Sequence, residues 1–228
     1  MATTTVTLDW LGLATPDVSE LVAYYESTFG LEAIDDPPCP EATVGFSLGD
    51  GWLVTRPYTT LPSGGVHTHF AISITESAYD QLYESLDTPV ERTFGGQRSL
   101  YHFDPAGHCV EFGERPALDS AVGPIFEVVL EVASLDIAIE RYRQLGFEPL
   151  DRGSDRPRCR LRGPFDLELW EPHLGIADAR GGCHVDLGIT VEDANAAAAV
   201  LGQSELPEID NRLFVRDPDG HTWWVADA

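Results

Sequence analysis

Lysine is missing from this sequence altogether, so the 14 basic residues among its 228 are all arginines. Against them stand 38 acidic residues, which leave a formal net charge of −24. A surface of this sign repels nucleic acid and anionic membranes, and we expect neither as a partner. Self-repulsion of so much charge is screened at multimolar salt. We therefore hypothesise a halophilic source, with an ordinary acidic cytosolic protein as the alternative; unfolding measured against KCl concentration separates the two.

Cysteine and long apolar runs are scarce as well. The four cysteines lie far apart and form no CxxC motif: Cys39, Cys109, Cys159 and Cys183. This spacing signals neither a zinc knuckle nor a disulfide framework, and it favours buried thiols in a reducing cytoplasm. No apolar run approaches the roughly 20 residues of a membrane span, and the first residues lack a basic segment followed by an apolar one. We expect a soluble, cytoplasmic protein.

What the chain does contain is a repeated unit of about 50 residues. Residues 125–172 read as a strand, a helix and two further extended runs, and residues 6–57 follow the same layout, with QLGFE and TFGLE at the same point. The other two repeats match each other, HFAISIT against HVDLGIT and DPAGH against DPDGH. The four predicted modules are residues 6–57, 66–115, 124–172 and 182–227. We assign the first two to a domain over residues 1–118 and the last two to a domain over residues 119–228.

This layout resembles the vicinal oxygen chelate superfamily, which includes glyoxalase I, extradiol dioxygenases, methylmalonyl-CoA epimerase, fosfomycin-resistance proteins and bleomycin-binding proteins. The resemblance covers essentially the whole chain and is carried by SLDIAIERYRQLGFE, DPAGHCVEF, DLELWEP and DPDGH, among others. It implies an α+β fold in which four βαβββ modules form two cupped half-barrels of mixed sheet. In this family the concave face of such a cup holds a divalent metal.

The resemblance also implies ligand positions on the first and last strand of each module. The first-strand position lies seven residues before the helix cap, so counting back from Ser134 leads to Glu127. The predicted metal ligands are His69, Glu111, Glu127, Glu168 and His184. The remaining positions have lost their ligands to other residue types, namely Trp10, Leu53 or Thr55, and Trp224, and we expect the two tryptophans to fill a cup or to stack on a ligand.

How the modules pair decides which ligands share a cup, and the sequence leaves this open. If the second and third modules share one, His69, Glu111, Glu127 and Glu168 form a set of one imidazole and three carboxylates. That set suits zinc, nickel, manganese or cobalt. If the modules pair one with two and three with four, Glu127, Glu168 and His184 share a cup, and His69 and Glu111 share the other. Neither arrangement puts two histidines and one glutamate together, which counts against an iron-dependent dioxygenase.

Two other groups of polar residues have simpler interpretations. His108 and His221 follow the turn glycines of DPAGH and DPDGH, and we expect both to be exposed turn residues. Arg158, Arg160 and Arg162 alternate along one face of a predicted strand. There they meet either an anionic substrate or solvent and salt-bridge partners.

For function, the resemblance implies a metal-dependent, glyoxalase-like lyase or isomerase that acts on a small oxygenated metabolite. Glu168, or in second place Glu111, would leave the metal and move a proton between neighbouring carbons. The alternative is a metal-free small-molecule-binding protein of the bleomycin-resistance type, supported by the lost ligands and by five tryptophans. An extradiol-type dioxygenase is a distant third. We expect a monomer or homodimer, and no motif signals a thiol cofactor.

Overall fold

The computed structural model describes residues 6–40, 42, 44–58, 66–116, 118–172, 185–204 and 208–228. Its elements follow the order strand, helix and three strands, four times over. The predicted α+β fold of four βαβββ modules is therefore confirmed. Within its described part, no helix is both long enough and apolar enough to cross a membrane.

The bounds of the elements fall within the four predicted modules. The first module comprises β1 (Thr7–Thr15), α1 (Val18–Phe29), β2 (Ile34–Asp35), β3 (Val44–Leu48) and β4 (Gly51–Pro57). The second comprises β5 (Val66–Ile74), α2 (Glu76–Ser85), β6 (Val90–Phe94), β7 (Gln97–Phe103) and β8 (Cys109–Glu114). The third comprises β9 (Val122–Glu131), α3 (Leu135–Arg143), β10 (Glu148–Arg152), β11 (Arg158–Arg162) and β12 (Asp166–Trp170). The fourth comprises β13 (Val185–Val191), α4 (Ala194–Leu201), β14 (Gln203–Ser204), β15 (Leu213–Arg216) and β16 (Thr222–Asp227).

The modules pair in an order that the sequence left open. One eight-stranded sheet has the order β14-β15-β16-β13-β1-β4-β3-β2 and joins the first module to the fourth. The other has the order β10-β11-β12-β9-β5-β8-β7-β6 and joins the second module to the third. Antiparallel pairing of β1 with β13, and of β5 with β9, connects the modules. Each sheet thus takes one module from residues 1–118 and one from residues 119–228.

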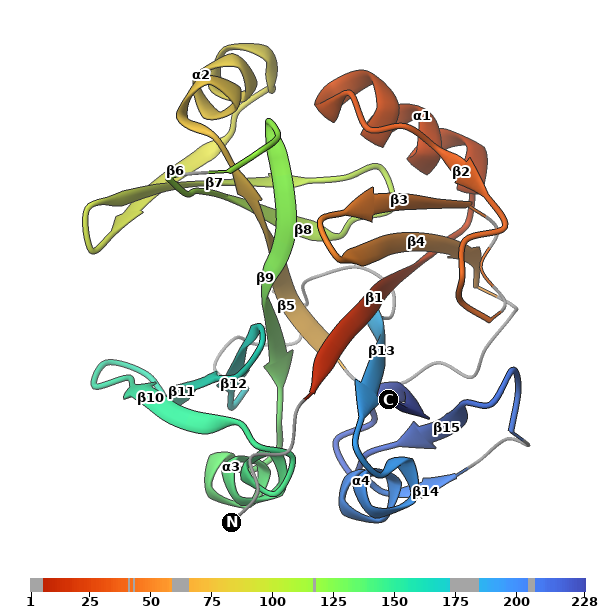
Figure 1. The fold of residues 1–228 in the computed structure, drawn as a ribbon. Helices are drawn as coiled ribbons and strands as arrows, with labels where there is room; N and C mark the ends of the chain where they lie inside the picture. The colour runs from red at the N-terminus through yellow and green to blue at the C-terminus, as the bar shows by residue number, and fades with distance from the viewer. Residues whose placement is uncertain are drawn as a thin grey trace.

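The helices cover the outer faces of the two sheets. Figure 1 shows α1 beside α2 at one end of the molecule and α3 beside α4 at the other, and these helix pairs are in contact. Apolar residues on the centre strands, such as Leu11 and Leu187 in one sheet and Phe70 and Val128 in the other, are fully buried in this core. Because side chains alternate along a strand, the residues between them point to the opposite, concave faces.

Local chemistry sets the start of each helix, with one departure from expectation. At α1 the Asp17 side chain accepts a hydrogen bond from the Glu20 backbone N–H at 3.0 Å. Ser134 occupies the corresponding cap position of α3, but its side chain makes no capping hydrogen bond. The backbone N–H of Leu135 donates instead to Oε1 of Glu171 at 2.9 Å. A carboxylate from the end of β12 therefore caps α3 and ties it to the sheet.

The histidines of the two DPxGH turns are not exposed, which corrects the prediction for them. His108 is completely buried, and its Nε2 lies 3.0 Å from the backbone oxygen of Ala14. His221 is also buried, and its Nε2 lies 2.8 Å from the backbone oxygen of Glu131. Each imidazole reaches the first strand of the preceding module. Their role is to join modules, a long-range contact that turn chemistry alone does not predict.

The aspartates of the same turns make a second join between modules. Asp104 accepts a hydrogen bond from the Tyr25 hydroxyl of α1 at 3.1 Å. Asp217 accepts one from the Tyr142 hydroxyl of α3 at 2.7 Å. All four residues are buried, so each bond is shielded from water. The first module is tied to the second in this way, and the third to the fourth.

Candidate functional site

The register between β5 and β9 relates the second and third modules by a local twofold axis. His69 pairs with Val129, and Ala71 pairs with Glu127. Rotation about the axis therefore exchanges His69 with Glu127 and Ala71 with Val129. Counting seven residues back from the cap of α3 predicted that Glu127 occupies the ligand position equivalent to that of His69. The strand register places Glu127 at that position.

The same axis relates the two carboxylates on the last strands. Glu111 on β8 pairs with Ala71, and Glu168 on β12 pairs with Val129. Residues directly opposite one another, and residues two apart on a strand, point to one face of a sheet. His69, Glu111, Glu127 and Glu168 consequently share one concave face, which we call the open cup.

Burial shows that the acids of the open cup are turned inward. Glu127 is 1% exposed and Glu168 is 5% exposed. Glu111 and His69 are buried as well. Carboxylates are almost never buried to this extent without a partner, so each of them has one.

His69 and Glu111 form the first pair of the open cup. Nε2 of His69 lies 3.2 Å from Oε2 of Glu111, which also accepts a hydrogen bond from the Tyr101 hydroxyl at 2.7 Å. Burial would lower the pKa of His69, but the Glu111 carboxylate and the charges of Glu127 and Glu168 raise it overall. Burial would raise the pKa of Glu111, but its bonds to His69 and Tyr101 hold it below the ordinary value. The pair therefore favours an imidazolium beside a carboxylate.

Glu127 and Arg160 form the second pair. Nη2 of Arg160 lies 2.9 Å from Oε1 and 3.0 Å from Oε2 of Glu127. Burial raises the pKa of Glu127 to about 7, against the opposing effect of Arg160 and with a further rise from Glu168. Although Nη2 is close, Oε1 accepts no hydrogen bond of good geometry and is buried. One oxygen of Glu127 is thus left poorly satisfied at the bottom of the cup.

Glu168 and Arg158 form the third pair, in which Arg158 also has a second carboxylate partner. Nη1 of Arg158 donates to Oε1 of Glu168 at 2.8 Å and lies 2.9 Å from Oδ2 of Asp151. Asp151 lies on β10, at the rim of the sheet, and is exposed. Arg158 is therefore shared between a buried and an exposed carboxylate.

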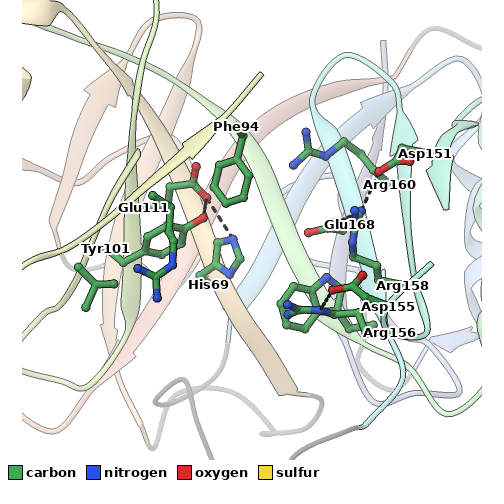
Figure 2. A pocket seen from close by; sticks show the side chains of 13 residues that line it. His69, Phe94, Tyr101, Glu111, Asp151, Asp155, Arg156, Arg158, Arg160 and Glu168 are labelled. Atoms are coloured by element: carbon green, nitrogen blue, oxygen red, sulfur yellow. Dashed lines mark hydrogen bonds and ion pairs between the residues drawn. The ribbon is translucent and has the colours of Figure 1, made fainter. Parts of the chain in front are cut away.

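A cavity of about 620 Å³ opens over these pairs. Figure 2 shows His69, Glu111 and Tyr101 on one side of it and Glu168, Arg158 and Arg160 on the other. It is lined by His69, Val90, Arg92, Phe94, Tyr101, Glu111, Asp151, Asp155, Arg156, Arg158, Arg160, Glu168 and Trp170. Its volume lies within the range of small-molecule sites, about 300–1,000 Å³.

The donor set of the open cup fits a divalent cation in the kind of side chains that it offers. One imidazole and three carboxylates project from adjacent strands of one face, and the poorly satisfied oxygen of Glu127 lies among them. Within the described residues, however, no three His, Cys, Asp or Glu side chains lie close enough together to form a ready metal site. Arg158 and Arg160 hold two of the carboxylates instead. A bound cation would require both guanidinium groups to release them.

The other sheet has an equivalent face, which we call the closed cup. There Trp10 pairs with Gly188 and Gly12 pairs with Asp186, so that the local axis exchanges Trp10 with Asp186. A side chain at Gly188 would clash with the Trp10 ring, and one at Gly12 would clash with the Asp186 carboxylate. His184, the predicted ligand of this module, lies outside the described residues.

Asp186 is therefore a residue that sequence reasoning missed. The signal was present, because counting seven residues back from Asp193, whose side chain caps α4, leads to Asp186. Its Oδ1 accepts hydrogen bonds from Trp10 Nε1 at 3.0 Å and from Arg56 Nη2 at 3.1 Å. Arg56 Nε lies 3.0 Å from Oδ2, and both side chains of this ion pair are buried.

The last strands of the closed cup carry no ligands. Val54 pairs with Gly12, and Trp224 pairs with Gly188. The expectation of Leu53 or Thr55 at this position is wrong by one residue, because strand alternation turns Val54 to the concave face and Leu53 to the helices. Trp224 stands where it was predicted. The side chains of Trp10, Val54, Phe214 and Trp224 form a buried apolar cluster that fills the closed cup.

Comparison with known proteins agrees with this architecture. No protein-family model matches the chain. Metallothiol transferase FosB of Lysinibacillus sphaericus (strain C3-41) is 28% identical over 119 residues, which are 48% of this chain and 82% of that protein. The crystal structure of glyoxalase I from Zea mays superposes with a TM-score of 0.72 at 20% identity, covering 98% of this chain and 93% of that one. A putative dioxygenase from Bacillus subtilis subsp. subtilis str. 168 gives a TM-score of 0.72 at 14% identity, with 99% and 86% covered. At these identities the two structures establish the fold alone.

Proposed function

Since this chain has the fold of the vicinal oxygen chelate superfamily, we propose that its open cup is the metal site of a glyoxalase-like lyase or isomerase. The observation that carries the proposal is the twofold relation of the four donors. His69 and Glu127 occupy equivalent positions, as do Glu111 and Glu168, and all four lie on one concave face. Three of them, His69, Glu111 and Glu168, line the cavity. A chance set of buried acids would have no reason to follow this symmetry.

The residues that would hold the metal are His69, Glu111, Glu127 and Glu168. A divalent cation bound there would supply Lewis-acid polarisation of a substrate oxygen. This donor set suits zinc, nickel, manganese or cobalt. Tyr101 orients Glu111 by donating to its Oε2, which fixes the carboxylate against the strand.

We assign proton transfer to Glu168. Its Oε1 accepts from Arg158, which leaves Oε2 as the atom that takes the proton from a substrate carbon. Glu111 is the weaker candidate, because the hydrogen bonds from His69 and Tyr101 lower the pKa of its carboxyl group, which makes it a weaker base.

The walls of the cavity favour a small substrate that has both oxygen atoms and an apolar part. Val90, Arg92 and Phe94 alternate along β6 and all line the cavity from one side. Trp170 lines it from the opposite module, with the Arg156 guanidinium 4.8 Å from the centre of its ring. The apolar side chains would exclude water around the substrate, and the arginines would bind its oxygens.

Metal analysis of purified protein tests the proposal. We expect one equivalent of divalent metal, lost in His69→Ala and in Glu168→Gln. His102→Ala is the matched control, since His102 lies outside the open cup and stacks on Tyr24. Full metal content in both cup variants would contradict the assignment of the site.

Activity on adducts of methylglyoxal with low-molecular-weight thiols tests the reaction class. Similarity to a metallothiol transferase supports including several thiols in the panel. We expect turnover that Glu168→Gln reduces by at least 100-fold, about the size of a lost general base. Metal binding with no turnover on the panel would keep the metal site and reject the glyoxalase-like reaction.

A metal-free small-molecule-binding protein is the second candidate. The observation in its favour is that Arg158 and Arg160 already neutralise Glu168 and Glu127. Under this alternative the ion pairs would be permanent parts of the pocket wall. Absence of metal from protein prepared in metal-containing buffer, together with ligand binding insensitive to EDTA, would favour it.

A further inference from the structure

The cavity of the open cup is lined by as many arginines as acidic residues, although the chain as a whole is strongly acidic. Arg92, Arg156, Arg158 and Arg160 line its cavity, which is four of the 14 basic residues in a sequence of net charge −24. Arginine is the preferred partner of carboxylate and phosphate groups. The cavity is therefore equipped to bind an anion as well as a cation.

Arg160 differs from Arg158 in having a single partner. Among the residues that the structure describes, Glu127 is the only carboxylate within ion-pair distance of Arg160. Its side chain is 35% exposed at the cavity, whereas that of Glu127 is almost fully buried. Arg158 has Asp151 as a second partner at 2.9 Å and keeps a counter-ion if Glu168 is taken away. If Glu127 is taken away, Arg160 has no other carboxylate within ion-pair distance in the described part of the chain, although the charges of Glu168 and Asp166 still act on it.

Nη2 of Arg160 lies within 3.0 Å of both oxygens of Glu127 and reaches them from the cavity. A divalent cation that approaches Glu127 from the cavity therefore meets this guanidinium, and the two positive charges repel each other. The cation must therefore displace Arg160 from Glu127. The displaced guanidinium remains tethered to β11 beside the cavity. It is then a partly exposed donor with no carboxylate within ion-pair distance among the described residues, which favours binding of an oxyanion.

We propose that Arg160 is an exchangeable counter-ion: it neutralises Glu127 in the metal-free protein and binds an oxyanion group of the ligand once a divalent cation occupies the carboxylates. This inference rests on the proposed metal site. It assigns the ligand class as a small molecule with a carboxylate or phosphate group. Because coupling between two ligands is reciprocal, the cation strengthens binding of the anion, and the anion strengthens binding of the cation by the same factor.

Titration of the full chain with Co²⁺ at pH 8 tests the proposal. Binding is measured by calorimetry and by the visible absorption of the bound cobalt. Each protein is titrated under three conditions, namely without an added anion, with acetate and with inorganic phosphate. Comparing the last two distinguishes a carboxylate from a phosphate as the bound oxyanion. The variants are Arg160→Gln and Arg158→Gln. Arg162→Gln is the matched control, because Arg162 lies on the same strand, is exposed and does not line the cavity.

We expect Arg160→Gln to bind Co²⁺ about 10-fold more tightly than the natural protein, with a smaller gain for Arg158→Gln and none for Arg162→Gln. In the natural protein acetate or phosphate should tighten Co²⁺ binding, and Arg160→Gln should abolish that coupling. Tight Co²⁺ binding that Arg160→Gln leaves unchanged, or weakens, would overturn the exchange while keeping the metal site. Failure of every protein to bind Co²⁺ would overturn the metal site and the exchange together.

Discussion

The open and closed cups have the same topology and the same local symmetry, yet different side chains occupy their equivalent positions. In the closed cup two of the four equivalent positions hold tryptophan, and the apolar cluster around them is buried. In the open cup all four hold ligand-type side chains beneath a cavity of about 620 Å³. The backbone thus provides two sites, and side-chain volume decides which of them remains accessible.

The two cups also differ in the solvent exposure of the arginine that neutralises their buried carboxylate. Asp186 and Arg56 form an ion pair from which water is excluded, with Arg56 only 2% exposed. Glu127 is equally buried, but Arg160 reaches it from the cavity. A guanidinium with no route to solvent has a structural role, whereas one at a cavity wall can exchange partners.

The largest effect should come from breaking the pair in the closed cup. Asp186→Ala leaves the buried Arg56 charge without its carboxylate and should lower the free energy of unfolding by about 3–5 kcal/mol. Urea unfolding measures this. The double variant Arg56→Met, Asp186→Leu is the control, and we expect it to recover most of the loss. A single variant as stable as the natural protein would contradict a structural role for the pair.

The two joins between modules allow a second, smaller test. Tyr25→Phe and Tyr142→Phe each remove one buried hydrogen bond to a carboxylate, which should cost about 1.5–3 kcal/mol. We expect Tyr25→Phe to cost more, because Asp217 retains Trp223 Nε1 at 3.4 Å and Arg141 at 3.9 Å after Tyr142 is changed. Thermal and urea unfolding compare the two. A larger loss for Tyr142→Phe would reverse this ranking.

The pH dependence of stability probes Glu127 in the open cup. Burial raises its pKa from the ordinary 4.5 to about 7. The folded state then holds a proton that the unfolded state has released, so stability falls as pH rises from about 4.5 to 7. Glutamine does not titrate, and Glu127→Gln should therefore gain about 2 kcal/mol over the natural protein between pH 5 and pH 8. Unfolding of EDTA-treated protein at both values measures the difference, and an equal change in both proteins would contradict it.

The smallest effect should come from Glu168 in the open cup. Glu168→Ala leaves Arg158 with Asp151, so no charge is stranded, and we expect a loss below about 1 kcal/mol. Urea unfolding of metal-free protein measures it beside Asp186→Ala. Equal losses for the two variants would remove the energetic distinction between the cups.

Much of the site could be predicted before the structure, because it depends on local order along the chain. The distance from a helix cap to a strand position is set within one module, and it placed Glu127 where the register has it. The same count from Asp193 would have found Asp186. Side-chain partners distant in the sequence could not be predicted, because neither the contact of His108 with Ala14 nor that of Arg160 with Glu127 is signalled by any spacing.

The sequence by itself determined the four modules, their strand and helix order and the residue types at the ligand positions, because these follow from periodicity and repeats within about 50 residues. Only the tertiary structure decided that the second module pairs with the third and the first with the fourth. Strand edges of all four modules offer similar backbone hydrogen bonds, so the choice between partners depends on the packing of whole faces. That packing put the four donors into one cup and Trp10 and Trp224 into the other.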